Sequence, residues 1–110
     1  MQERERRVGL NEAVFRQVNE RIEGLNEAFG AITETMQVIC ECGDASCIEQ
    51  ITISLPEYEE LRQDPRRFAL VPGHEDERVE RVVERRDGYH VVEKDEGGPA
   101  RLAERTDPRS

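Results

Sequence analysis

The chain has 110 residues, of which 37% are charged and 35% hydrophobic, a balance that leaves room for one domain with a thin core. Its formal net charge of −9 at pH 7 would repel a phosphate backbone, which argues against nucleic acid as a partner. The opening residues MQERERRVGL lack the apolar centre of a signal peptide, and no apolar run approaches the roughly 20 residues that span a bilayer, so we expect a cytoplasmic protein without a membrane partner.

Residues 1–30 carry the clearest periodicity and predict one amphipathic helix that ends at Gly30. Its apolar seam follows the a/d spacing of a coiled coil and consists of Val8, Asn11, Phe15, Val18, Ile22, Leu25 and Phe29. Two interpretations stay open. The seam packs on the chain's own domain, or it binds another protein or a second copy, a coiled-coil homodimer in which Asn11 sets the register.

The period changes to two after Thr35, which predicts a β-hairpin. Its arms are residues 36–41 and 48–53, and the block CGDASC between them supplies the turn. Ser54 then begins a short helix, with Glu57 three residues later as its capping-box partner, and this helix ends before Pro65.

Residues 68–71 predict a further strand, followed by a turn at Pro72-Gly73. Residues 78–94 predict a second hairpin around Asp87-Gly88, whereas residues 95–110 mix glycine, proline and charge and are predicted to be disordered. The predicted fold is therefore α+β: a long N-terminal helix, then a small domain over residues 31–94 that is rich in β-hairpins, has one short helix and is stapled by zinc.

The three cysteines form a Cys-x-Cys-x4-Cys pattern at the tip of the first hairpin. Cys40 and Cys42 share one face of a strand, and Cys47 returns from the other arm, so the three thiols converge. Clustered thiols in a reducing cytosol are typical of a metal site. We predict one structural Zn²⁺ with His74 as the fourth ligand, because the turn before it presents the ring at a chain reversal; His90 is the reserve candidate.

Other interpretations of the cysteines stay open: a Cys42–Cys47 disulfide, buried thiols, or a redox- or metal-responsive sensor whose oxidation releases the metal. Catalytic zinc needs an open coordination position, which three cysteines and a histidine would close, so we expect no enzyme and assign no catalytic residue. The expected function is a non-catalytic zinc module for protein–protein interaction or self-association.

Two clusters of charged residues are expected to be structural and not to form functional sites. The carboxylates of Glu57, Glu59 and Glu60 are expected to form a solvated helix face, not an acid/base pair. The arginines at 66–67 and 85–86 are expected to form surface salt bridges rather than a phosphate site.

Four blocks occur in order between Met36 and Lys94: CECG-x3-C, SLPEYEELR, DPRRFALVPGH and VERVVERRDGYHVVEK. Together they resemble a small family of proteins of GC-rich, actinobacterial-type bacteria, for which no activity is established. The resemblance supports the cysteine and histidine set but implies no function. It extends neither to the N-terminal helix nor to the tail.

Overall fold

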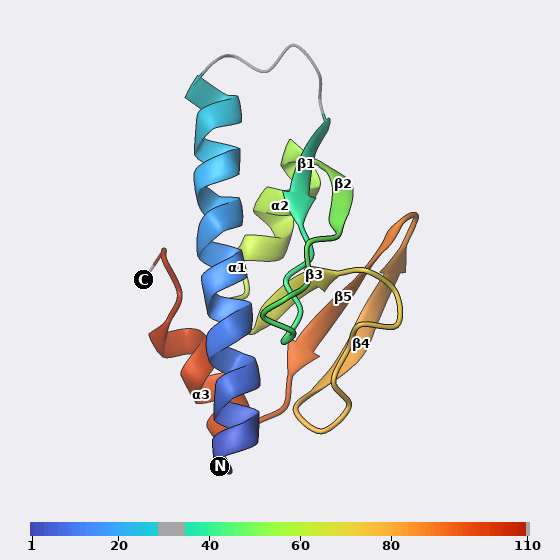
Figure 1. The fold of residues 1–110 in the computed structure, drawn as a ribbon. Helices are drawn as coiled ribbons and strands as arrows, with labels where there is room; N and C mark the ends of the chain where they lie inside the picture. The colour runs from blue at the N-terminus through green and yellow to red at the C-terminus, as the bar shows by residue number, and fades with distance from the viewer. Residues whose placement is uncertain (29–34, 110) are drawn as a thin grey trace.

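The computed structural model describes residues 1–28 and 35–109, and the elements up to residue 94 follow the predicted order (Figure 1). The helices are α1 (Glu3–Ala28), α2 (Leu55–Arg62) and α3 (Gly98–Arg105). The strands are β1 (Thr35–Ile39), β2 (Gln50–Ser54), β3 (Arg67–Leu70), β4 (Glu80–Arg86) and β5 (Tyr89–Lys94). The α+β prediction with a long N-terminal helix is confirmed. The expected helix end at Gly30 and the seam residue Phe29 lie outside the described residues.

The strands form two small antiparallel sheets. β1 pairs with β2, which places Thr35 opposite Ser54, and the second sheet has the order β3-β5-β4. The backbone N–H of Glu41 donates to the carbonyl of Ala69 over 2.8 Å and joins the two sheets. Both predicted hairpins are present, although β1 ends at Ile39 and β2 begins at Gln50, so the predicted arms 36–41 and 48–53 were drawn too far toward the turn. Gly88 at the β4–β5 turn has a φ of 88°, which glycine adopts without steric cost.

The predicted capping box begins α2. The Ser54 hydroxyl accepts from the Glu57 backbone N–H over 3.1 Å, and the Glu57 carboxylate accepts from the Ser54 N–H over 3.2 Å. This arrangement satisfies two backbone donors that the helix itself leaves free. The start of α2 is thereby fixed, and the helix buries Tyr58 and Leu61 against the β1–β2 hairpin.

The prediction that residues 95–110 are disordered is wrong, because α3 forms there. Ala100, Leu102 and Ala103 are buried; Ala103 joins the core cluster that contains Phe68 and Leu70, and Leu102 packs at Gly9 of α1. Gly9 makes this contact possible, since a Cβ at that position would lie 2.7 Å from a Leu102 methyl carbon. The composition of residues 95–110, rich in glycine and charge, gave no indication of this helix, because three apolar side chains are enough to anchor it.

α1 runs along most of the molecule (Figure 1). The side chains that it buries most deeply are mostly polar and are not those of the predicted apolar seam. Its buried polar side chains are Glu12, Arg16, Asn19 and Glu23. Arg16 is fully buried: it donates to the carbonyls of Pro65 and Ala103 over 2.6 and 2.8 Å and stacks 4.5 Å from the centre of the Phe68 ring. Buried charge is tolerated only with such partners.

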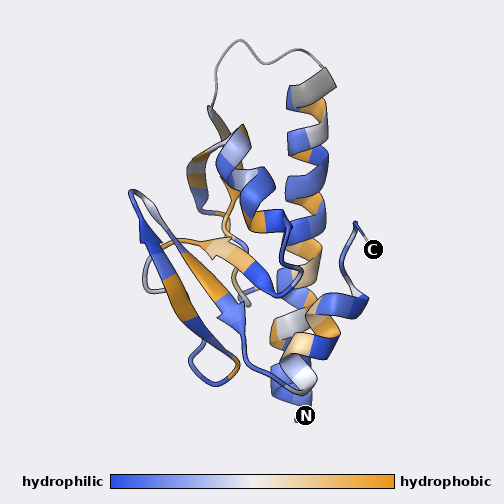
Figure 2. Ribbon diagram, turned by 180° about the vertical axis from the view of Figure 1, so that it is seen from behind, coloured by the Kyte–Doolittle hydropathy of each residue, from blue (hydrophilic) through white to orange (hydrophobic). Residues whose placement is uncertain are grey.

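The predicted seam of α1 is split between two environments. Val8, Phe15 and Ile22 are half-buried at the border of the fold, whereas Val18 and Leu25 are 41% and 60% exposed. Hydrophobic and hydrophilic residues alternate along α1 in Figure 2. Four exposed apolar residues form what we name the outer stripe: Leu10, Val14, Val18 and Leu25.

Candidate metal centre

The four predicted ligands come together where the β1–β2 hairpin meets the loop after β3. Cys40 directly follows β1 and is held by its backbone N–H, which donates to the carbonyl of Glu49 over 2.9 Å. Cys42 and Cys47 lie in the connection between β1 and β2, where the Cys47 N–H donates to the Asp44 carbonyl over 3.0 Å. The hairpin therefore presents three sulfur atoms from one short stretch of chain.

His74 reaches the sulfurs through the predicted turn. Its backbone N–H donates to the carbonyl of Val71 over 3.0 Å, and Gly73 has a φ of 93°, a conformation that favours glycine. The turn reverses the chain after β3 and directs the imidazole back toward the cysteines.

The ligand atoms of Cys40, Cys42, Cys47 and His74 all lie within 4.8 Å of one another. Nδ1 of His74 is 3.5 Å from the sulfur of Cys40 and 3.8 Å from that of Cys47. A tetrahedral zinc ion with Zn–S of about 2.3 Å and Zn–N of about 2.0 Å requires sulfur–nitrogen separations of about 3.5 Å. The thiols are free, so the alternative of a Cys42–Cys47 disulfide is not found. The donor set and its spacing fit a zinc ion.

The thiols differ in ionisation. A hydrogen bond from Cys40 lowers the pKa of Cys42 to about 5, with burial opposing the shift. The pKa of Cys40 is raised, first by that same hydrogen bond and then by burial, and burial also raises the pKa of Cys47. A divalent cation would supply the positive charge that favours the thiolate form of all three cysteines.

Backbone amides surround the sulfurs. The N–H of Val71 donates to the Cys40 sulfur over 3.2 Å, and the N–H groups of Asp44 and Glu49 donate to the sulfurs of Cys42 and Cys47. These donors offset the negative charge of metal-bound thiolates. Cys40 and Cys42 are buried, whereas Cys47 and His74 are half-buried, so the cluster faces solvent on the Cys47 and His74 side.

The other ring nitrogen of His74 has its own partner, which sequence reasoning missed. Nε2 lies 2.9 Å from a carboxylate oxygen of Glu49. A metal-bound histidine commonly donates its second N–H to a carboxylate in this way. The only signal in the sequence was an acidic residue two positions after Cys47.

The cysteine loop also rests on α1. Asn11, predicted to set the register of a coiled coil, donates from its side-chain amide to the Gly43 carbonyl over 2.8 Å. A Cβ at Gly43 would overlap the side chain of Val8, so the helix and the loop meet closely because this residue is glycine.

The reserve candidate His90 takes no part in this cluster. It lies in β5, opposite Leu70 of β3 and Arg85 of β4. Within the described part of the chain, its buried Nδ1 has no hydrogen-bond partner.

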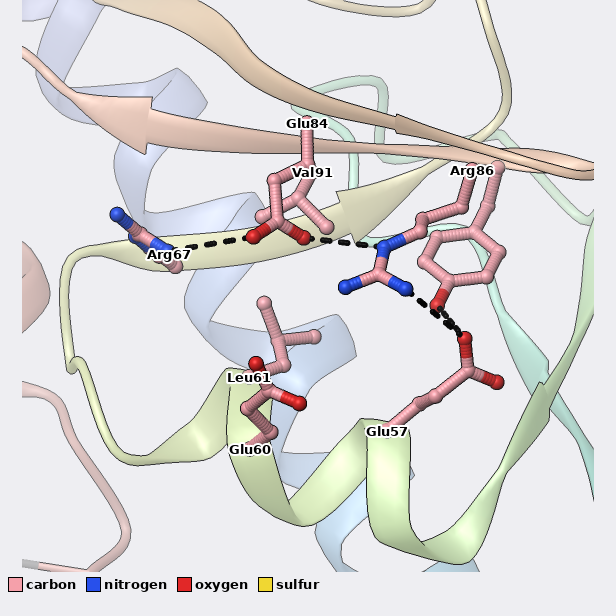
Figure 3. A pocket seen from close by; sticks show the side chains of 8 residues that line it. Glu57, Glu60, Leu61, Arg67, Glu84, Arg86 and Val91 are labelled. Carbon is pink, nitrogen blue, oxygen red and sulfur yellow. Dashed lines mark hydrogen bonds and ion pairs between the residues drawn. The ribbon is translucent and has the colours of Figure 1, made fainter.

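A small hollow lies between α2 and the β3-β5-β4 sheet, and the residues that line it include no cysteine or histidine that could bind a metal (Figure 3). Its volume of about 20 Å³ admits roughly one water molecule. Arg67, Glu84, Arg86 and Glu57 form a chain of ion pairs around it, and the Tyr89 hydroxyl donates to Glu57 over 3.0 Å. Figure 3 shows these side chains directed toward one another, not into an open site.

Two carboxylates of α2, Glu57 and Glu59, have structural partners, and Glu60 is exposed as expected. Hydrogen bonds from Ser54 lower the pKa of Glu57, and the Arg109 guanidinium, 2.7 Å from Glu59, lowers the pKa of that carboxyl. Neither carboxyl group holds a proton near neutral pH for acid catalysis. The salt bridges predicted for Arg66, Arg67 and Arg86 are confirmed, whereas Arg85 forms none with the described residues.

No protein-family model, no curated protein and no solved structure matches this chain. The resemblance to a bacterial family therefore stays a prediction. Among the described residues, no helix has both the length and the apolar character that crossing a membrane requires.

Proposed function

We propose that the protein is a non-catalytic interaction module whose fold is held by one structural zinc ion on Cys40, Cys42, Cys47 and His74. The observation that carries the proposal is the convergence of these four ligand atoms within 4.8 Å. Three sulfurs and one nitrogen complete a tetrahedral shell and leave no position for a catalytic water molecule. The proposed compartment is the cytoplasm, where thiols stay reduced.

The proposal that the protein binds a partner rests on the outer stripe of α1. Leu10, Val14, Val18 and Leu25 are 37–60% exposed, while the opposite side of the same helix buries charged groups. Burying one such apolar side chain contributes about 1.5–3 kcal/mol. The proposed partner is a second copy of the chain, with another protein as the alternative.

Elemental analysis of protein purified without added metal tests the zinc site. We expect about one zinc per chain, and none in a Cys40→Ser variant. Chelation should unfold the cysteine hairpin, because zinc binding and folding are coupled in small metal domains. Metal-free protein that keeps its native fold would overturn the proposal.

Sedimentation at tens of micromolar tests self-association. Val14→Glu places a charge in the outer stripe and should convert a dimer to a monomer. Gln63→Glu adds the same charge at an exposed position after α2 and should leave the dimer intact. Monomers in the wild type and both variants would show that the helix does not bind a second copy.

The half-exposed position of Cys47 favours one second candidate, a thiol sensor. Hydrogen peroxide would take two electrons from two thiolates, which form a disulfide, and with two protons would become two water molecules, releasing the zinc. A chromogenic chelator would follow that release. Zinc retained under excess peroxide would exclude the sensor and leave the structural site in place.

A further inference from the structure

We propose that Glu49 positions His74 for metal binding: it accepts a hydrogen bond from Nε2–H and thereby makes Nδ1 the nitrogen that binds the metal. This inference rests on the zinc site proposed above and names a residue that the cysteine and histidine pattern does not contain.

The orientation of the imidazole supports this role. Nδ1 faces the sulfurs of Cys40 and Cys47 at 3.5 and 3.8 Å, while Nε2 lies 2.9 Å from the Glu49 carboxylate. A neutral imidazole carries its proton on one nitrogen and its free lone pair on the other. With the proton held at Nε2 by the carboxylate, the lone pair is on Nδ1, directed at the point where the sulfurs converge.

The backbone of Glu49 fixes the place from which its carboxylate acts. Its carbonyl accepts from the Cys40 N–H over 2.9 Å, and its own N–H donates to the Cys47 sulfur. Glu49 therefore contacts three of the four proposed ligand residues: Cys40 and Cys47 through its backbone, and His74 through its side chain. The hairpin that presents the sulfurs also presents the group that orients the imidazole.

An exposed ion pair with no metal role would affect neither metal affinity nor the choice of nitrogen. The Glu49 side chain is 57% exposed and that of His74 is 30% exposed, so the pair contributes little to folding by itself. Its effect should appear in the metal site, which makes affinity and histidine spectroscopy the informative measurements.

Zinc affinity, measured by competition with a chromogenic chelator, tests the proposal in the full chain. Glu49→Ala should weaken binding about 10- to 100-fold, the range found for groups that orient metal ligands. Glu49→Gln should recover most of the loss, because its amide oxygen still accepts from Nε2–H. Glu77→Ala is the matched control: it removes an exposed carboxylate from the loop that carries His74, and should change affinity less than about twofold.

Long-range ¹H–¹⁵N correlation spectra of His74 provide the second measurement. The wild type with zinc should show a protonated Nε2 and a metal-bound Nδ1, and Glu49→Ala should lose that fixed pattern. Coordination through Nε2, or unchanged zinc affinity in Glu49→Ala, would overturn the role of Glu49 and leave the zinc site standing. Wild-type protein that binds no zinc would overturn both.

Discussion

Asn11 donates a hydrogen bond from its side-chain amide to the carbonyl oxygen of Gly43 over 2.8 Å, and this bond ties α1 to the cysteine loop. Val8, one turn earlier on the helix, packs on the same glycine. The loop between Cys42 and Cys47 thus holds two of the proposed zinc ligands and supports the N-terminal helix. Metal binding and helix packing therefore share one segment of chain.

Asn11→Ala should lower the free energy of unfolding by about 1–2 kcal/mol, because the half-buried Gly43 carbonyl loses its donor. It should also weaken zinc binding, since the loop loses its support. Chemical denaturation and chelator competition measure the two effects. Gln17→Ala removes an exposed amide from the same helix and should stay within about 0.5 kcal/mol of the wild type. Equal zinc affinities in the two variants would contradict the coupling.

His74→Ala and His90→Ala should differ in zinc affinity. Only His74 has a ring nitrogen within 4.8 Å of the three sulfurs, so its loss removes a ligand, whereas His90 lies in β5. We expect a loss of at least about 100-fold for His74→Ala, equivalent to about 2.7 kcal/mol, and less than about twofold for His90→Ala. A larger loss at His90 would show that the ligand assignment is wrong.

Glu12 and Glu80 both contact Lys94, and all three side chains are buried. The Lys94 ammonium donates to Glu12 and, over 3.0 Å, to Glu80. Burial, reinforced by the neighbouring Glu80 carboxyl, raises the pKa of Glu12 well above its ordinary value. A group whose folded pKa is raised stabilises the fold fully below its unfolded pKa, and that stabilisation is lost as the pH rises through the folded pKa.

Glu12→Gln should therefore gain stability relative to the wild type as the pH rises from about 5, by at most about 1.4 kcal/mol for each pH unit. The glutamine resembles the protonated carboxyl and does not titrate. Urea denaturation with zinc present, repeated at several pH values, measures the difference between the two proteins. Gln17→Ala, at an exposed position of the same helix, removes no titratable group and should show a difference that does not change with pH. If the difference in free energy of unfolding between Glu12→Gln and the wild type were also independent of pH, the pKa of Glu12 would not be raised by folding.

Leu102→Ala should destabilise the protein by about 2–3 kcal/mol, the low end for removing a buried leucine side chain. The side chain packs at Gly9 of α1, so the loss should appear in the global transition, not only in the tail. Arg101→Ala, at the exposed neighbouring position, should cost less than about 0.5 kcal/mol. Thermal or urea unfolding measures the stability of both variants against that of the wild type. If both variants unfold like the wild type, α3 does not contribute to the fold.

Local features of the sequence determined most of the secondary structure. The Ser54–Glu57 capping box and the Asp87-Gly88 turn act over a few residues, and each forms where it was predicted. The cysteine cluster is also largely local, because Cys40, Cys42 and Cys47 lie in one connection between β1 and β2, although β1 ends at Ile39 and strand alternation does not extend to Cys42. Periodicity and turn chemistry suffice for such features, since their interacting groups are close in the sequence.

The orientation of α1 was decided only by tertiary structure. The apolar pattern left open whether Val18 and Leu25 pack on the domain or bind another chain; the fold buries Glu12 and Arg16 and leaves those two exposed. A buried charge is stable only when its partners are in place. Those partners are 82 residues away for Glu12, at Lys94, and 49 and 87 residues away for Arg16. No periodicity within a helix records partners at that distance, and for the same reason Glu49 could be recognised beside His74 only in the folded chain.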